Sequence, residues 1–203
     1  IGTPPRLQLI REDILKSGKM NSWEADDYLQ WYDAYDRFLK EKGFDKAFPT
    51  VDDLTRSMGN VSFYYQGRII ENIRISNTVD AYAVNGWESM KLENHSGIVD
   101  NYRFPKGDPE VMARYNAPLY LAVKMNRKVV STGDTTLVDT YIVNEKNLKG
   151  PYILNLVAKD ESGNVVASHK ERVTVKGGND YGQCLQSGWA FIPKSKGYTR
   201  IEA

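Results

Sequence analysis

The sequence has few of the residues that build metal sites and disulfide frameworks. Cys184 is its single cysteine, which excludes an internal disulfide and any metal site made of several cysteines. Its two histidines, His95 and His169, lie far apart along the chain, so we expect no metal site. No glycine-rich stretch follows a predicted strand with the spacing of a phosphate-binding loop, and we expect no bound cofactor.

The chain also lacks long apolar runs and an excess of charge of one sign. No apolar run approaches the roughly 20 residues of a membrane-spanning helix, so we expect no membrane span. Over 203 residues, 27 basic and 26 acidic side chains leave a formal net charge of +1, which gives no electrostatic footprint for nucleic acid. Residues 1–5 contain neither an initiator methionine nor a signal peptide, and we expect the chain to be a segment of a longer protein.

The first part of the chain is typical of helices. Apolar residues recur at helical spacing, and Gly18, Gly43 and Asn77 are expected to end successive helices. Aromatic residues between Tyr28 and Leu39 form a stripe on one face, which favours a helix docked on a core over a platform for sugars. Four further elements are predicted in this part of the chain: a short helix over 51–58, a longer one over about 61–76, a buried strand over 79–85, and a short helix that begins at Pro109.

Beyond Pro118 the hydrophobic period changes from 3.6 residues to 2. Short β-rich segments alternate with polar turns, and residues 160–164 (Asp-Glu-Ser-Gly-Asn) have the composition of a hairpin turn. This pattern is typical of an antiparallel sandwich. The expected fold class is therefore α+β, with a mainly helical segment over 1–117 and a β-sandwich over 118–203.

Candidate functional residues follow the predicted strand over 79–85. Trp87 and Glu88 come directly after it, and Asn94 and His95 lie in the polar loop beyond. In α/β proteins, ligands bind beyond the carboxyl ends of the strands. Trp87 could offer a face to a sugar ring or could pack at the end of the strand, and Glu88 could bind a sugar hydroxyl or pair with an arginine.

A glycosidase would need two carboxyl groups on opposite sides of the scissile bond. Glu88, Glu93 and Asp100 are the carboxylates near this loop, but their positions in the sequence do not show that any two of them approach each other. The residues alone therefore do not identify which reaction, if any, this loop would catalyse.

Several stretches resemble members of glycoside hydrolase family 2, and more closely the multidomain β-galactosidase-like enzymes common in Bacteroidetes. The first half resembles the last strand and following loop of their catalytic (β/α)8 barrel, in residues 85–88 (Asn-Gly-Trp-Glu), 93–100 (Glu-Asn-His-Ser-Gly-Ile-Val-Asp), 102–103 (Tyr-Arg) and 105–106 (Pro-Lys). The second half resembles the immunoglobulin-like domain that follows the barrel, in residues 143–145, 148–152, 159–166 and 197–198. The stretches in the first half are more specific to this family than those in the second half.

The resemblance implies a fragment of a retaining glycoside hydrolase that acts on a β-linked glycan. Both catalytic glutamates of the family would lie upstream of residue 1, so the resemblance assigns no catalytic residue to this chain. It leaves Trp87, Glu88, Asn94 and His95 as substrate-binding candidates. The fragment alone is expected to be inactive, and the implied location is periplasmic or extracellular in a bacterium.

Two further expectations concern partners. A single barrel strand over 79–85 has lost its neighbours, so we expect it to be paired elsewhere, covered by the helices or used in a homodimer. The sandwich is expected to lack its last strand, which leaves an open edge or a strand swap. The alternative to the enzyme fragment is a non-catalytic module that binds glycan or protein.

Overall fold

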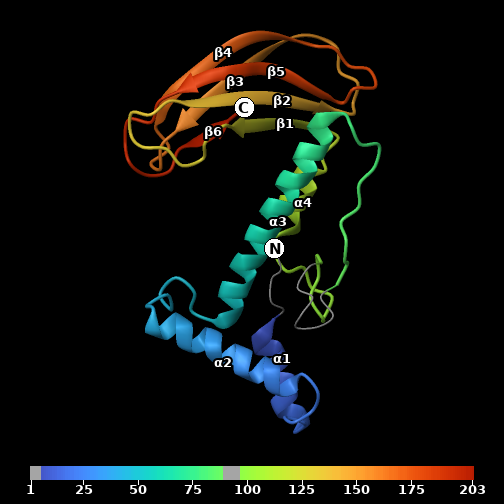
Figure 1. Ribbon diagram of the computed structural model, residues 1–203, viewed down its shortest axis with the longest axis vertical. Coiled ribbons are helices and arrows are strands. Elements are labelled where there is room, and N and C mark those ends of the chain that lie inside the picture. The colour runs from blue at the N-terminus through green and yellow to red at the C-terminus, as the bar shows by residue number, and fades with distance from the viewer. Residues whose placement is uncertain (1–5, 89–96) are drawn as a thin grey trace. The chain divides into compact units, whose positions relative to one another are not determined.

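The computed structural model describes residues 6–88 and 97–203, which form an α+β protein as predicted (Figure 1). The helices within this part are α1 (Leu7–Ser17), α2 (Ala25–Glu41), α3 (Val51–Ser76) and α4 (Pro109–Tyr115). The strands are β1 (Leu119–Met125), β2 (Thr136–Asn144), β3 (Gly150–Lys159), β4 (Val165–Val175), β5 (Gly182–Phe191) and β6 (Arg200–Glu202). Among the described residues, no helix is long and apolar enough to cross a membrane.

The chain divides into two compact units, and each is considered separately. The helical unit consists of Ile1–Ile69 and Tyr82–Arg114, and the sheet unit of Ile70–Ala81 and Tyr115–Ala203. The division falls inside α3, so the last two turns of this helix belong to the sheet unit. The sequence pattern predicts a domain boundary at Pro118 and none within this helix.

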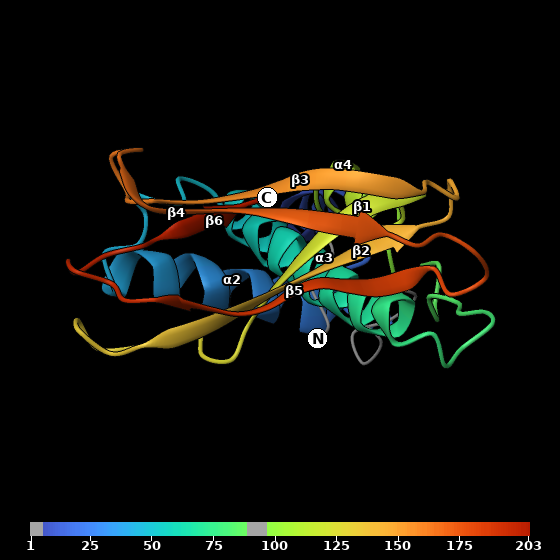
Figure 2. The ribbon, with the colours of Figure 1, turned by 90° about the horizontal axis from the view of Figure 1, so that it is seen from above.

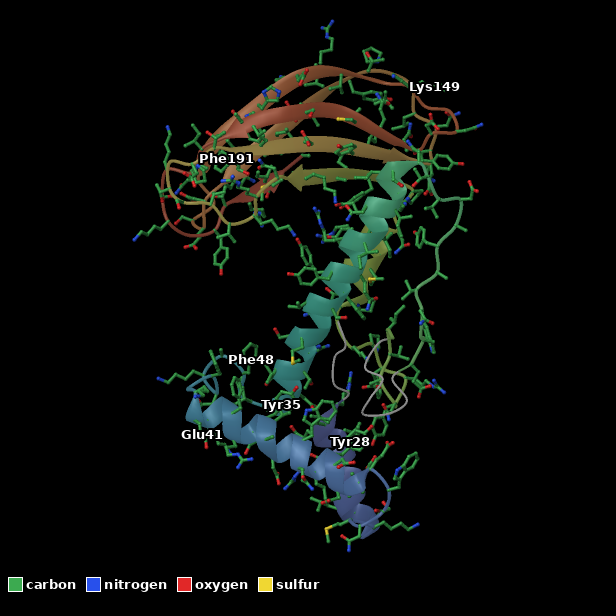
Figure 3. All side chains as sticks on the ribbon, in the orientation of Figure 1. Tyr28, Tyr35, Glu41, Phe48, Lys149 and Phe191 are labelled. Carbon is green, nitrogen blue, oxygen red and sulfur yellow. The ribbon has the colours of Figure 1, made fainter. Side chains whose placement is uncertain are left out.

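A small apolar core holds the helical unit together. Leu7 and Ile10 of α1, Tyr28 and Leu39 of α2 and Val51 of α3 are buried in one cluster. The aromatic stripe on α2 packs against this cluster through Trp31, Tyr32 and Tyr35, which confirms that it serves as a docking face. Tyr28 and Tyr35 of α2 are labelled in Figure 3.

Helix α3 is a single helix of 26 residues, so the prediction of two helices separated near Gly59 and Asn60 is wrong. Both residues make contacts with the segment 106–108 instead. A Cβ on Gly59 would lie 1.9 Å from the carbonyl oxygen of Lys106, so glycine permits a close approach of two backbones. The side-chain oxygen of Asn60 accepts a hydrogen bond from the amide of Asp108 at 2.7 Å.

The predicted strand over 79–85 is not formed. These residues are exposed and belong to neither sheet, so they are not covered by the helices, and their use in a homodimer stays a prediction. A strand needs a neighbour for its amides and carbonyls. All strands in the described part of the chain lie between residues 119 and 202, and residues 79–85 join neither of their two sheets.

The sheet unit consists of two antiparallel three-stranded sheets with a shared core (Figure 2). The strand orders are β1-β2-β5 and β4-β3-β6. Val138 and Phe191 from the first sheet pack with Ala158 from the second, and Leu154 and Leu156 pack beside them. The hairpin turn between β3 and β4 forms at Asp160–Asn164 as predicted, with Gly163 at φ +83°.

The end of α3 is attached to the sheet unit by polar side chains. Asn77 ends the helix in the left-handed conformation, and its side-chain amide both donates to the carbonyl and accepts from the amide of Gly182. The buried guanidinium of Arg74 donates to the carbonyls of Tyr115 and Ala117 at 2.6 and 2.7 Å and pairs with Glu145. Arg74 thereby satisfies carbonyls that α4 leaves without a helical partner.

Candidate functional site

A tight hairpin over residues 98–106 fixes the backbone next to the predicted site. The amides of Ile98 and Val99 both donate to the carbonyl of Trp87 at 3.0 Å, and the amide of Lys106 donates to the carbonyl of Ile98 at the same distance. Val99 forms bridges with Glu88 on one side and Pro105 on the other. The predicted site residues Trp87 and Glu88 are thus held by main-chain bonds.

Gly97 makes this close approach possible. It adopts φ +91°, and a Cβ at this position would lie about 3.0 Å from the backbone of Glu88. A side chain would meet both the backbone strain of the left-handed region and the neighbouring segment. The glycine therefore sets the position of Glu88 relative to the hairpin.

Trp87 and Glu88 present an aromatic ring and a charged pair from adjacent positions. The Trp87 side chain is 64% exposed. Glu88 forms an ion pair with Arg103, a residue that adopts φ +67° in the turn of the hairpin. Of the two roles predicted for Glu88, the structure shows the pairing with an arginine. The ring of Trp87 is open to solvent and is not packed at the end of a strand.

Asp100 is the internal anchor of the hairpin. Its side chain is 1% exposed, and one carboxylate oxygen accepts the amides of Tyr102 and Phe104 at 2.9 and 3.0 Å. The other oxygen lies 3.1 Å from Nε of Arg6, whose guanidinium lies 4.3 Å from the centre of the Phe104 ring. The two amide donors and the ion partner offset much of the cost of burying this carboxylate, although Oδ2 accepts no hydrogen bond from the described residues.

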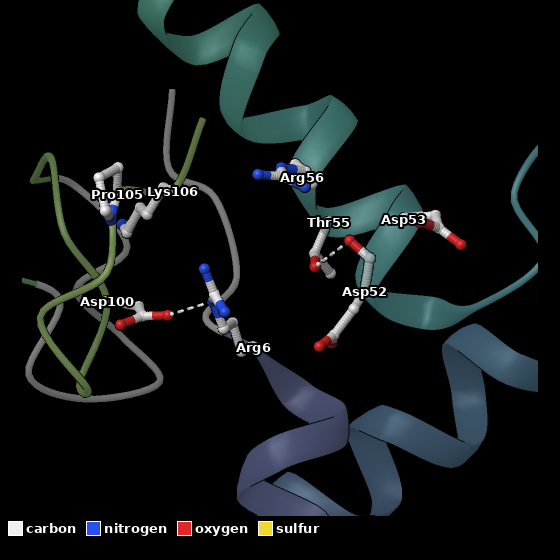
Figure 4. Close-up of a pocket in the computed structure, with 8 residues that line it drawn as sticks. All are labelled: Arg6, Asp52, Asp53, Thr55, Arg56, Asp100, Pro105 and Lys106. Atoms are coloured by element: carbon white, nitrogen blue, oxygen red, sulfur yellow. Dashed lines mark hydrogen bonds and ion pairs between the residues drawn. The ribbon is translucent and has the colours of Figure 1, made fainter. Parts of the chain in front are cut away.

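A polar cavity of about 180 Å³ lies beside this anchor (Figure 4). Its walls come from the start of α1, the first turns of α3 and the hairpin, and they carry three cationic and three acidic side chains. The lining residues are Arg6, Asp52, Asp53, Thr55, Arg56, Asp100, Pro105 and Lys106. Charges of both signs give the cavity hydrogen-bond donors and acceptors at no net charge, a combination that suits hydroxyl groups.

Burial shifts the pKa of several groups around the cavity. Lys106 is 6% exposed, and desolvation lowers its pKa to about 8 although the carboxylate of Asp100 acts in the opposite direction. Desolvation also raises the pKa of Asp52, against the opposing effects of the Gln8 amide and Arg6. The pKa of Tyr102 is raised, first by desolvation and then by the hydrogen bond from its hydroxyl to Asp13 at 2.6 Å.

Part of this site was predicted from the sequence. It singled out Trp87, Glu88 and Asp100, which the hairpin brings into one small region. Asn94 and His95, the other two predicted site residues, lie outside the described residues, as does Glu93. Arg6, Asp52 and Lys106 were missed as site residues, because they come from three separate segments and carry no local pattern of their own.

Two further findings bear on the chemistry of the chain. Within residues 6–88 and 97–203, no group of three or more His, Cys, Asp or Glu side chains is placed to hold a metal ion. Comparisons of the chain with protein-family models, curated proteins and solved structures gave no match.

Proposed function

We propose that the chain is part of a retaining glycoside hydrolase acting on a β-linked glycan, and that it supplies substrate contacts to that enzyme. The observation that carries the proposal is the exposed Trp87 ring beside the Glu88–Arg103 ion pair, both fixed by the hairpin over 98–106. The resemblance of residues 85–106 to family 2 glycoside hydrolases supplies the reaction type.

The side chains around Trp87 suit the two kinds of surface on a sugar ring. An exposed indole offers a flat apolar face, which can cover the C–H face of a pyranose. The oxygens of Glu88 and the N–H groups of Arg103 can then accept and donate hydrogen bonds to hydroxyls. The ion pair keeps both groups in one geometry before the sugar arrives, which reduces the ordering needed on binding.

Glu88 is assigned to binding rather than to the chemical step. A retaining enzyme uses two carboxyl groups about 5 Å apart, one of which donates a proton to the leaving group. The Glu88 carboxylate is occupied by Arg103 and suits the role of a hydrogen-bond acceptor. The catalytic glutamates are proposed to lie upstream of residue 1, so the chain alone should not hydrolyse glycosides.

The first test is an activity assay on the chain and on the longer gene product that contains it. Aryl β-glycosides should be hydrolysed by the longer protein and not by the 203-residue chain. Hydrolysis by the chain itself would contradict the assignment of the catalytic carboxylates. A longer protein that binds glycans without hydrolysing any of them would favour the non-catalytic binding module.

The second test uses a matched pair of tryptophan variants in the longer protein. Trp87→Ala should raise KM for oligosaccharides by about tenfold, because a ring-stacking contact is worth roughly 1–1.5 kcal/mol. Trp23→Ala removes another exposed tryptophan of the helical unit, 79% exposed, and should leave KM unchanged. Equal effects of the two substitutions would remove the reason for assigning Trp87 to the substrate.

A further inference from the structure

A second cavity lies entirely within the sheet unit. It has a volume of about 510 Å³, within the range of small-ligand sites, and lies between the loops that follow β1 and β5. Its floor contains Met125, Phe191 and Ile201, which are apolar, and Phe191 is labelled at this end of the sheets in Figure 3. The cavity therefore has an apolar base and walls made of loops.

The two loops are held in place by hydrogen bonds. The buried hydroxyl of Thr136 lies 3.1 Å from the carbonyl of Arg127 and also contacts the side chain of Asn126. The amide of Gly133 donates to the carbonyl of Pro193 at 2.9 Å and so connects one loop to the other. These bonds give the walls of the cavity a defined shape, which lowers the ordering required to bind a ligand.

The charge of the cavity has one sign. Arg127, Lys128 and Lys196 line it, and none of the described lining residues is an aspartate or glutamate. Two acidic side chains lie behind lining residues: Asp134 accepts the amide of Ser131, and Glu161 accepts the amide of Tyr198 at 2.8 Å, so the three cations still outnumber them. A cavity lined by cations alone concentrates anions, in contrast to the charge-balanced cavity of the helical unit.

Tyr198 adds an exposed aromatic ring at the mouth of the cavity. Its side chain is 86% exposed, yet its backbone is fixed by the bond to Glu161. The preceding Gly197 has φ +112°, and a Cβ there would lie 2.7 Å from the Glu161 carboxylate. Hydroxyl groups of Ser131, Thr132, Ser195 and Thr199 also line the cavity, together with the apolar residues Val129, Val130 and Pro193.

We propose that this cavity binds an acidic oligosaccharide, with its anionic groups on Arg127 and Lys196 and a sugar ring against Tyr198. The combination of cations, hydroxyls, an exposed aromatic ring and apolar lining residues matches a carboxylated or sulfated sugar. The choice of a glycan as ligand rests on the proposed function, and the inference assigns an acidic glycan to this second site. It also places a binding site in the sheet unit, separate from Trp87.

Calorimetric titration of the 203-residue chain tests this proposal with three oligosaccharides. An oligomannuronate carries carboxylates on a β-linked backbone, a chondroitin sulfate oligosaccharide carries sulfates, and cellohexaose is a neutral β-linked reference. At least one acidic ligand should bind about tenfold more tightly than cellohexaose at about 50 mM sodium chloride, and this preference should shrink at about 300 mM. Chondroitin sulfate carries uronate carboxylates as well as sulfates, so tighter binding of it than of the oligomannuronate would show that sulfate contributes to binding.

Substitutions then locate the site. Arg127→Gln combined with Lys196→Gln should weaken the acidic ligand by about tenfold, and Tyr198→Ala by about fivefold. The matched control is Lys170→Gln combined with Arg172→Gln, which removes the same charges from exposed positions on β4, outside the cavity. Thermal unfolding of each variant should match that of the unaltered chain, because all these side chains are exposed.

Three outcomes would overturn the proposal: no preference for acidic ligands, an equal loss in the control variant, or tighter binding of an oligothymidylate than of either acidic glycan. The experiments distinguish a failure of this inference from a failure of the proposed function. Hydrolysis that depends on Trp87 without binding at Arg127 would reject only the acidic site. Binding at Arg127 with no hydrolysis by the longer protein would reject the enzyme and retain the site.

Discussion

The carboxylate of Asp100 and the guanidinium of Arg6 form an ion pair with an O–N distance of 3.1 Å. The pair connects the start of α1 to the hairpin that holds Trp87, although the two residues lie in distant parts of the sequence. Because the same carboxylate also accepts two hairpin amides, the order of the whole site depends on it.

Asp100→Asn should loosen the hairpin. The amide side chain keeps a hydrogen-bond acceptor but loses the charge that pairs with Arg6, at an expected cost of about 1–2 kcal/mol. Hydrogen exchange at the amides of Tyr102 and Phe104 measures this directly, and it should become faster. Asp33→Asn on the exposed face of α2 is the matched control and should leave both amides unchanged; faster exchange in both variants would argue against a specific anchor.

Gly59→Ala should destabilise the protein. Alanine in place of glycine inside a helix ordinarily adds about 0.5–1 kcal/mol of stability, but here the new methyl group would meet the carbonyl of Lys106. We expect a net loss of about 1–3 kcal/mol from overpacking, measured by urea unfolding. Ser57→Ala in the same helix should be neutral or slightly stabilising, and a gain in stability from Gly59→Ala would show that the two backbones are not in contact.

Arg74→Met should destabilise the sheet unit more than Glu145→Gln does. The first substitution leaves the carbonyls of Tyr115 and Ala117 without their donor, at about 2–4 kcal/mol. The second removes only an ion pair whose carboxylate side chain is 41% exposed, so water can replace the partner at less than about 1 kcal/mol. Thermal unfolding compares them, with Arg172→Met on β4 as the control for loss of an exposed arginine; the reverse order of effects would contradict the role of Arg74 as a cap.

The stability of the chain should rise between about pH 8 and pH 10 because of Lys106. Its pKa falls from 10.5 to about 8 on folding, so the folded state loses the proton first and the unfolded state binds more protons in this window. The rise cannot exceed about 1.4 kcal/mol per pH unit for one group. Lys106→Met should abolish that part of the pH dependence in urea unfolding, and an unchanged pH profile in the variant would show that the lysine is not desolvated.

The sequence predicted those features of the fold that depend on local patterns. Glycine and asparagine ended helices at Gly18 and Asn77 because these positions need positive φ, and the alternating segments after Pro118 became strands. The helix over Pro109–Tyr115 also formed as predicted from its proline. In each case a few neighbouring residues determine the conformation.

The prediction was wrong where a distant segment decides the structure. Gly59 does not interrupt a helix, because it accommodates the backbone at Lys106. Residues 79–85 have the composition of a strand but no partner strand in the described part of the chain. The site was predicted at Trp87 and Glu88 from its local composition, whereas Arg6 and Asp52 reach it only through the tertiary fold.

We propose that the hairpin presents Trp87 as a sugar-binding surface, and a glycan titration of the 203-residue chain followed by NMR measures this most directly. Neutral β-linked oligosaccharides should shift the indole N–H resonance of Trp87 and leave that of Trp23 in place. Trp87→Ala should weaken the binding by about tenfold, whereas Trp23→Ala should preserve it. An unperturbed Trp87 resonance at saturating glycan, or unchanged affinity after Trp87→Ala, would contradict the account.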